Sequence, residues 1–338
     1  MRILFAGWHN PYFVSITEYI ERTLEKLGHC VEKFDYRQFS IPGRIRDKIE
    51  LLQRYDLARI NKKLIKTAIA FRPDLLFVLQ GTTILPETIS AIKHEYHIPT
   101  VNWFIDYPAE LEKALHLAKY YDFFFVSTAP AMLKHHQQGN KGVRTLLFAC
   151  DPDIHKKYEL GPEEKLKYGN DVVLIGSRYP EREEALGALR EFDLGIWGPG
   201  WKDLNKDSPL RNFYKEEAVG PQIWVKIFNA AKIILNINYG FNRLPEEDCN
   251  PGSVKLFEIL ACGAFQMVDA KKAIADIFTD KRHLVTFLDI TDLKNKLSYY
   301  LAHPEEREAI ALEGRKEVLA KHTYEERMKE MLSLIKLQ

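Results

Sequence analysis

Short apolar runs alternate with longer stretches of helical periodicity along the first 150 residues. The run at residues 2–6 ends at Gly7, and residues 13–27 follow with apolar side chains three or four positions apart. A second run lies at residues 29–34. A strand, a helix and a second strand in this order predict a β-α-β unit with parallel strands.

The same alternation continues to about residue 150. Further apolar runs lie at residues 75–79, 100–105, 123–126 and 144–147, and helical periodicity separates them. Six strands alternating with helices predict a doubly wound, Rossmann-like α/β domain over residues 1–150. His9 follows the first strand and Asp106 follows the strand at 100–105. Both are therefore expected at the carboxyl edge of the sheet, where open α/β folds bind ligands.

The pattern restarts after a polar stretch at residues 151–169, which contains Pro152, Gly161 and Pro162 and which we interpret as a linker. Apolar runs at 171–175, 194–197, 233–237, 265–268 and 284–287 predict a second Rossmann-like domain over residues 170–321. The last segment, 322–338, is predicted to cross back to the first domain. Two such domains in sequence predict a ligand cleft between their carboxyl edges.

Composition narrows the classes of function without selecting one. The 338 residues are 46% hydrophobic and 28% charged, with a formal net charge of +1. This balance gives no whole-protein field that favours nucleic acid or an anionic membrane. No apolar run reaches the roughly 18 residues of a membrane span. The four cysteines form no metal-binding pattern, so we expect reduced, structural thiols.

The stretch at residues 250–266 has the strongest local chemistry. Gly252 and Ser253 precede a short apolar helix in which Lys255 and Glu258 are the charged residues. A helix that begins with Gly and Ser offers unpaired backbone N–H groups to a phosphate. A carboxylate one turn further along can accept hydrogen bonds from sugar hydroxyls. The alternative is a capped core helix with a Lys–Glu pair at its surface.

Several motifs in order resemble one family. Leu256-Phe257-Glu258-Ile259 with Ala261-Cys262-Gly263-Ala264-Phe265 resembles the nucleotide-sugar motif of glycosyltransferases with the two-domain GT-B architecture. The more specific resemblance is to the spore maturation protein CgeB-like family, related to glycosyltransferase family 4. Further motifs that agree with it are residues 101–108, 175–177 with Arg182, 197–201, 235–237 and 322–324 with Arg327.

The resemblance implies two domains that face each other across a cleft, with the donor bound mainly by the second. Glu258 would then accept hydrogen bonds from the donor ribose, while Arg182 and Lys255 neutralise the diphosphate. Lys255 stands where the family is expected to have arginine. The residues predicted to bind the donor are Glu258, Lys255, Ser253, Gly252, Asn250, Arg182, Ser177, Gly198 and Trp201.

The acceptor side and the chemistry depend on fewer residues. Asp106 is predicted to be the general base for an acceptor hydroxyl, or else to cap the following helix, and His9 is a second catalytic candidate. Asn250 occupies the position of the first of two glutamates usual in family 4, and it cannot supply a negative charge. This difference argues against retaining chemistry. We identify no metal-binding DxD motif, and the resemblance implies that no catalytic metal is bound.

The predicted function is therefore transfer of a hexose from a UDP- or GDP-type sugar donor to a hydroxyl acceptor. The acceptor would be a carbohydrate, a glycolipid or a glycoprotein. The expected location is the cytoplasm, including the periphery of a membrane or a cell-surface assembly. Two alternatives are a nucleotide-sugar 2-epimerase and a non-catalytic nucleotide-sugar-binding or coat-assembly protein on the same fold.

Overall fold

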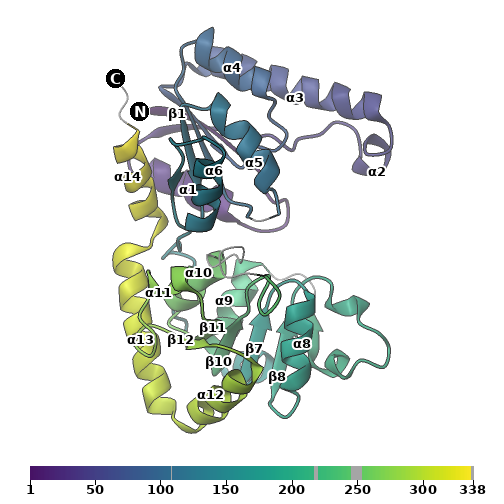
Figure 1. Cartoon of the computed structure of the whole chain (residues 1–338), viewed down its shortest axis with the longest axis vertical. Helices are drawn as coiled ribbons and strands as arrows, with labels where there is room; N and C mark the ends of the chain where they lie inside the picture. Colours follow the sequence, from purple (N-terminus) through teal and green to yellow (C-terminus); the bar gives the residue numbers. More distant parts are fainter. Residues whose placement is uncertain (108, 217–219, 245–252, 336–338) are drawn as a thin grey trace. The chain divides into compact units, whose positions relative to one another are not determined.

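The computed structural model describes residues 1–107, 109–216, 220–244 and 253–335. The chain forms two compact units (Figure 1). Unit 1 comprises Met1–Leu147 and Tyr324–Gln338, and unit 2 comprises Phe148–Thr323. Each unit is built around its own parallel β-sheet.

Unit 1 has a six-stranded sheet in the order β2-β1-β3-β4-β5-β6, and all neighbouring strands are parallel. In the register of the sheet, Ile3 pairs with Val31 on one side and with Leu75 on the other. The order corresponds to the 2-1-3-4-5 arrangement of doubly wound folds, in which the chain changes direction between its first and third strands. The strands are β1 (Arg2–Gly7), β2 (Cys30–Asp35), β3 (Leu75–Leu79), β4 (Thr100–Phe104), β5 (Phe123–Val126) and β6 (Arg144–Thr145).

Helices connect these strands and bury their apolar faces against the sheet. Leu4 and Ala6 of β1 share one apolar cluster with Ile60 and Leu64 of the long helix α3. The helices of the first 147 residues are α1 (Ile16–Lys26), α2 (Gly43–Arg46), α3 (Glu50–Phe71), α4 (Pro86–His94), α5 (Leu111–Leu117) with the 3₁₀ turn Ala118–Tyr120, and α6 (Ala129–Gln137).

The last helix, α14 (Tyr324–Leu334), completes unit 1 although it ends the chain. It packs against α1, as Figure 1 shows, and the rings of Tyr19 and Tyr324 lie 5.6 Å apart. The Nε of Arg327 donates a hydrogen bond of 3.0 Å to the carbonyl of Leu147. Met328 has no exposed surface. The C-terminal segment therefore forms part of the core of the unit that contains the N-terminus.

Unit 2 has a second six-stranded parallel sheet, in the order β12-β11-β10-β7-β8-β9. Counted along the chain this is the 3-2-1-4-5-6 order of the Rossmann fold, so the direction changes between β7 and β10. The strands are β7 (Val172–Ile175), β8 (Leu194–Trp197), β9 (Tyr214–Glu216), β10 (Ile233–Asn236), β11 (Gln266–Asp269) and β12 (Val285–Phe287).

Both faces of this sheet are covered. One face packs through Leu174, Leu235 and Met267, and the other packs through Val173, Ile175 and Ile234. The helices are α7 (Pro162–Tyr168), α8 (Pro180–Ala188), α9 (Pro221–Ala230), α10 (Val254–Ala261), α11 (Lys272–Ala275), α12 (Ile290–Ala302) and α13 (Pro304–Lys321), with 3₁₀ turns at Trp201–Asp203 and Pro209–Phe213.

The structure differs from the sequence-based expectation in three places. Residues 151–169, predicted as a linker, belong to unit 2, because His155, Leu160 and Tyr168 bury their side chains there. Between β2 and β3, where one stretch of helical periodicity was expected, the chain forms two helices, α2 and α3, and the backbone of Ile49 between them is extended. The short polar strand β9 was not predicted.

Candidate functional site

Arg182 joins the two strands at which unit 2 changes direction. It lies in α8, and its Nε donates a hydrogen bond of 2.8 Å to the carbonyl of Ile237, just after β10. Its Nη1 donates a hydrogen bond of 2.8 Å to the carbonyl of Ser177, just after β7. Desolvation lowers the pKa of Arg182 below its ordinary value, but a guanidinium stays protonated at neutral pH. A fixed cation therefore lies at the carboxyl edge of the sheet, where Rossmann folds bind ligands.

Gly198 and Trp201 hold the loops after β7 and β8 together. Gly198 has φ +127°, and a Cβ there would lie 2.4 Å from the carbonyl oxygen of Gly176. The indole Nε1 of Trp201 donates a hydrogen bond of 2.9 Å to the same oxygen. The side chain of Trp201 is fully buried in the core of unit 2. The prediction that Trp201 binds the donor disagrees with this placement, because its side chain has no exposed surface.

Helix α10 begins at a capped terminus. The Oγ of Ser253 accepts a hydrogen bond of 3.3 Å from the backbone N–H of Lys255, which is the contact expected of an N-cap serine. The backbone N–H of Leu256 also donates a hydrogen bond of 2.9 Å to the carbonyl of Ser253, so Ser253 pairs with two N–H groups of the first turn. Gly252 and Asn250, which were also predicted to bind the donor, lie outside the described residues.

Glu258 is the centre of a buried charged cluster in unit 2. Its Oε2 accepts a hydrogen bond of 2.9 Å from the Nζ of Lys255, and its Oε1 lies 3.4 Å from the Nε2 of His155. The His155 Nδ1 accepts a hydrogen bond from the backbone N–H of Asp151, which turns Nε2 toward the carboxylate. Glu258 is 2% exposed. The Lys255–Glu258 pair of the alternative interpretation is therefore present, but the Glu258 carboxylate is buried and the Lys255 side chain is 20% exposed.

The protonation of Glu258 follows from two opposing effects. Burial by itself would raise the pKa of this carboxyl. The Lys255 ammonium, the neighbouring His155 and the hydrogen bond from Lys255 outweigh the burial and lower the pKa below its ordinary value. Glu258 is therefore an ionised acceptor in a dry environment, where its hydrogen bonds are strong.

Two aromatic side chains of the neighbouring helix α9 contact the ammonium of Lys255. Its ammonium lies 3.4 Å from the ring centre of Trp224 and 5.7 Å from that of Phe228. This is the geometry of a cation–π interaction. Neither Trp224 nor His155 was predicted to belong to this site, because both lie far from α10 in sequence. His155 lies in the polar stretch at residues 151–169, which was interpreted as a linker.

In unit 1, Gln80 holds Asp106 in place. The Nε2 of Gln80 donates a hydrogen bond of 2.8 Å to Oδ2 of Asp106, and Oε1 accepts hydrogen bonds from the backbone N–H groups of Ile105 and Asp106. Desolvation of the carboxyl, together with the nearby Glu110 carboxylate, raises the pKa of Asp106. Helix α5 begins at Leu111, so Asp106 is not its N-cap, and that alternative is wrong.

His9 lies after β1 and contacts a different carboxylate. Its Nε2 is 2.6 Å from Oε1 of the buried Glu21 in α1, and Lys33 contacts the other oxygen of Glu21 at 3.4 Å. The hydrogen bond to Glu21 raises the pKa of His9. No hydrogen bond or ion pair joins His9 to Asp106 within the described parts of the chain. The two catalytic candidates therefore lie at one sheet edge without forming a direct pair.

Comparison with known proteins now becomes informative. The family described as glycosyl transferase-like matches residues 165–333, which is half of the chain. The chain belongs to this family. The family match spans unit 2 from α7 onward and extends into α14. The predicted glycosyltransferase is therefore confirmed at the level of the family.

Relatives of known sequence and structure agree with this assignment. Spore protein CgeB of Bacillus subtilis (strain 168) is 24% identical over 267 residues, covering 76% of this chain and 81% of that protein. The predicted CgeB-like resemblance is thus confirmed. Anabaena Alr3699/HepE, solved in complex with UDP-glucose, has a TM-score of 0.64 at 16% identity, covering 98% of this chain and 99% of its own. Sucrose-phosphate synthase (tll1590) from Thermosynechococcus elongatus has a TM-score of 0.72 at 12% identity, covering 98% of each chain.

These structural similarities confirm the predicted fold class, a GT-B architecture of two Rossmann-like domains.

Two further properties bear on function. Within the described residues, no three His, Cys, Asp or Glu side chains gather in an arrangement that could hold a metal ion. None of the helices in that part of the chain is long and apolar enough to cross a bilayer.

Proposed function

We propose that this glycosyltransferase moves a hexose from a nucleoside diphosphate sugar to a hydroxyl group of a carbohydrate, glycolipid or glycoprotein. The observation that carries the proposal is the ionised, buried Glu258 next to the capped start of α10. A UDP-type donor is favoured over a GDP-type donor, because the similar Anabaena protein was solved with UDP-glucose and with UDP.

Glu258 is the proposed ribose ligand. A carboxylate that accepts two hydroxyl hydrogen bonds in a dry site discriminates strongly against a ligand that lacks them. In the structure Lys255 covers this carboxylate, and the Lys255 side chain is 20% exposed against 3% for Glu258. A donor diphosphate that attracts the Lys255 ammonium would uncover Glu258 for the ribose. The same movement would bring the Lys255 ammonium from Glu258 to the diphosphate leaving group.

Arg182 and Ser253 are the proposed partners of the diphosphate. Two guanidinium nitrogens of Arg182 hold backbone carbonyls, while its Nη2 has no acceptor within the described residues. The start of α10 adds backbone N–H groups and the positive end of the helix dipole. Negative charge grows on the leaving nucleoside diphosphate in the transition state. Fixed cations and dipoles therefore stabilise the transition state more than the ground state.

Asp106 is the proposed general base for the acceptor hydroxyl, and His9 a second group on the acceptor side. The raised pKa of Asp106 brings this carboxyl closer to the operating pH than an ordinary aspartate. We propose that the reaction needs no metal ion. Asn250 would hydrogen-bond the transferred sugar without supplying a negative charge, which favours a mechanism with no nucleophilic or charged group at that position.

The decisive experiment is donor binding measured by calorimetry and by thermal unfolding. UDP, GDP and their hexose derivatives are titrated into the wild type and into Glu258→Gln. A donor at 100 times its dissociation constant should add about 2.7 kcal/mol to the free energy of unfolding. We expect Glu258→Gln to weaken binding of the donor at least about tenfold, because charge-assisted hydrogen bonds to the ribose are lost.

The matched control is Glu164→Gln. Glu164 also forms a Lys–Glu pair in unit 2, with Lys226 at 2.7 Å, but it is exposed and lies in α7. Its substitution should leave donor affinity unchanged. Equal affinity of the wild type and a folded Glu258→Gln variant would remove Glu258 from the site. The absence of binding by any nucleotide would overturn the donor proposal as a whole.

A further inference from the structure

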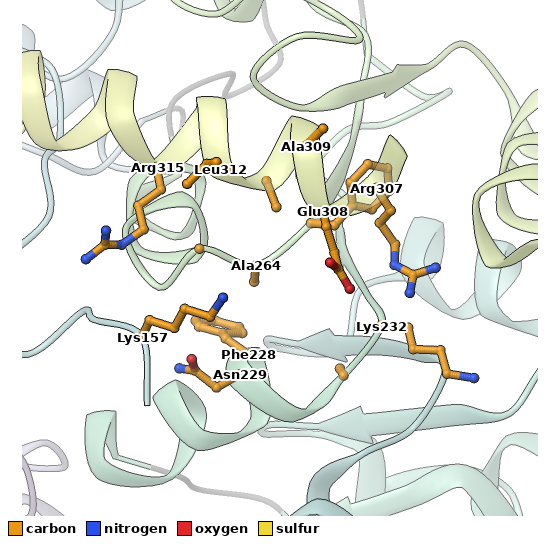
Figure 2. Close-up of a pocket in the computed structure, with 14 residues that line it drawn as sticks. Lys157, Phe228, Asn229, Lys232, Ala264, Arg307, Glu308, Ala309, Leu312 and Arg315 are labelled. Atoms are coloured by element: carbon orange, nitrogen blue, oxygen red, sulfur yellow. The ribbon is translucent and has the colours of Figure 1, made fainter. Parts of the chain in front are cut away.

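A pocket of about 540 Å³ opens on unit 2 at the amino-terminal edge of its sheet (Figure 2). Lys232 comes directly before β10, and Gly263, Ala264 and Phe265 come directly before β11. The proposed donor residues lie at the opposite, carboxyl edge. Helix α10 separates the two places, since Ser253 precedes it and Gly263 follows its last turn. Its eight residues span about 12 Å.

The charges of this pocket are mostly of one sign. Arg307, Glu308 and Arg315 come from one face of α13, where residues four apart lie next to each other. Lys157 and Lys232 come from segments on the other side. Four basic residues thus line the pocket against one acidic residue, although the formal net charge of the chain is +1. Cations gathered around a concave surface attract anions into it.

One end of the pocket is largely neutralised. The Nζ of Lys232 lies 2.6 Å from Oδ1 of Asp171. Arg307 donates a hydrogen bond of 2.7 Å from Nη1 to the carbonyl of Tyr300, and Glu308 lies next to Arg307 in Figure 2. The cationic charge of this end is therefore balanced by carboxylates of the chain itself.

The other end holds two cations without such partners. Lys157 and Arg315 lie on the same side of the pocket in Figure 2, and no carboxylate of the described residues forms an ion pair with either. The side chains of both pass close to Gly263. A Cβ at Gly263 would lie 3.1 Å from Cδ of Arg315 and 3.9 Å from Cδ of Lys157. The aliphatic parts of both side chains therefore pass the same glycine.

Both cations are also held in place. The Nε of Arg315 donates a hydrogen bond of 3.2 Å to the carbonyl of Ala261 at the end of α10, which leaves its terminal nitrogens for another acceptor. Lys157 lies between two residues that Asn229 of α9 fixes. The amide nitrogen of Asn229 donates to the carbonyl of Lys156 at 3.0 Å, and its amide oxygen accepts from the N–H of Tyr158 at 2.9 Å.

We propose that this pocket is a second ligand site, which binds a phosphomonoester. The phosphate would lie between Lys157 and Arg315, where a planar guanidinium and an ammonium provide donors of the geometry that phosphate prefers. The organic part would lie against the apolar side chains that line the pocket, which include Ala264, Phe228 and Leu312. A volume of about 540 Å³ is within the range of small-molecule sites.

The test is calorimetric titration of the full chain with phenyl phosphate, inorganic phosphate and phenol at constant ionic strength. Phenyl phosphate should bind more tightly than inorganic phosphate, and phenol should not bind. Lys157→Gln and Arg315→Gln should each weaken phenyl phosphate about tenfold or more. Lys316→Gln is the matched control, because Lys316 follows Arg315 in the same turn of α13 but pairs with Glu313 at 2.7 Å.

Two variants keep the outcome unambiguous. Lys157→Gln removes an exposed side chain and should leave the melting temperature unchanged, so its result does not depend on folding. Lys255→Gln reports the donor site and should leave phenyl phosphate binding intact. A loss of binding in Lys255→Gln alone, an equal loss in Lys316→Gln, or no binding to the wild type would each overturn the proposal. Equal affinity for inorganic phosphate would overturn the assignment of an organic part.

Discussion

At the scale of the residue, Gln80 has a strained backbone, and its side chain holds Asp106 by hydrogen bonds. It adopts φ +64°, a left-handed conformation that costs a residue with a side chain about 1–2 kcal/mol. It is 5% exposed, and its amide group makes three contacts with Ile105 and Asp106. Strain of this kind persists where the surrounding structure determines the conformation, often at a functional site. We infer that Gln80 is a positioning residue for Asp106.

The variant Gln80→Gly separates the backbone strain of Gln80 from the hydrogen bonds of its side chain. Glycine adopts the left-handed conformation without strain, so the free energy of unfolding should change by less than about 1 kcal/mol. The Asp106 carboxylate loses its hydrogen bond, and we expect kcat to fall about tenfold or more because the base is no longer held in position. The acidic limb of the pH–rate profile should also move. Arg72→Gly is the control: Arg72 has φ +49° at the end of α3, away from Asp106.

His9 gives a prediction for the pH dependence of stability. Glu21 raises the pKa of His9 above 6.5, so protonated His9 stabilises the folded state. This contribution is complete below the unfolded pKa of about 6.5 and is lost as pH rises through the higher folded value. His9→Gln should therefore lose about 0.5–1 kcal/mol at pH 6 and much less at pH 9. Urea unfolding at both pH values measures this, and the exposed His94→Gln should show no such difference.

At the scale of the element, periodicity was sufficient for the strands and helices that bury continuous apolar runs. Periodicity did not predict the elements that exist only because of tertiary contacts. Strand β9 has three polar or half-buried residues, Tyr214–Glu216, and exists because it pairs with β8. The stretch at 151–169 has the composition of a linker, yet His155 and Tyr168 are buried by residues that follow later in the chain.

The candidate site shows the same division between local and tertiary information. Lys255 and Glu258 are three residues apart on α10, so their pairing could be predicted from helix geometry. The contact of Glu258 with His155 joins positions separated by about a hundred residues, and no local pattern contains it. Trp201 was predicted at the ligand from its place after a strand. Only the packing of unit 2 shows that its ring is enclosed.

At the scale of the whole molecule, the chain order and the folding units do not coincide. Unit 1 requires α14, whose residues are separated from Leu147 by the whole of unit 2. A chain without its last helix would leave the surface of α1 that α14 covers exposed to solvent. Folding of the N-terminal unit therefore depends on residues that are synthesised after the whole of unit 2.

Two methionines test this arrangement with the same substitution. Met328 of α14 and Met267 of β11 both have no exposed surface. Each replacement by alanine should cost about 2–5 kcal/mol, through lost burial and the cavity that remains. Met328→Ala should accelerate amide hydrogen exchange in β1, β3 and β4 of unit 1, because α14 belongs to that core. Met267→Ala should do so in β7, β10 and β11 of unit 2. Faster exchange confined to unit 2 in Met328→Ala would contradict the assignment of the last helix, because the cavity would then have weakened a core that α14 does not join.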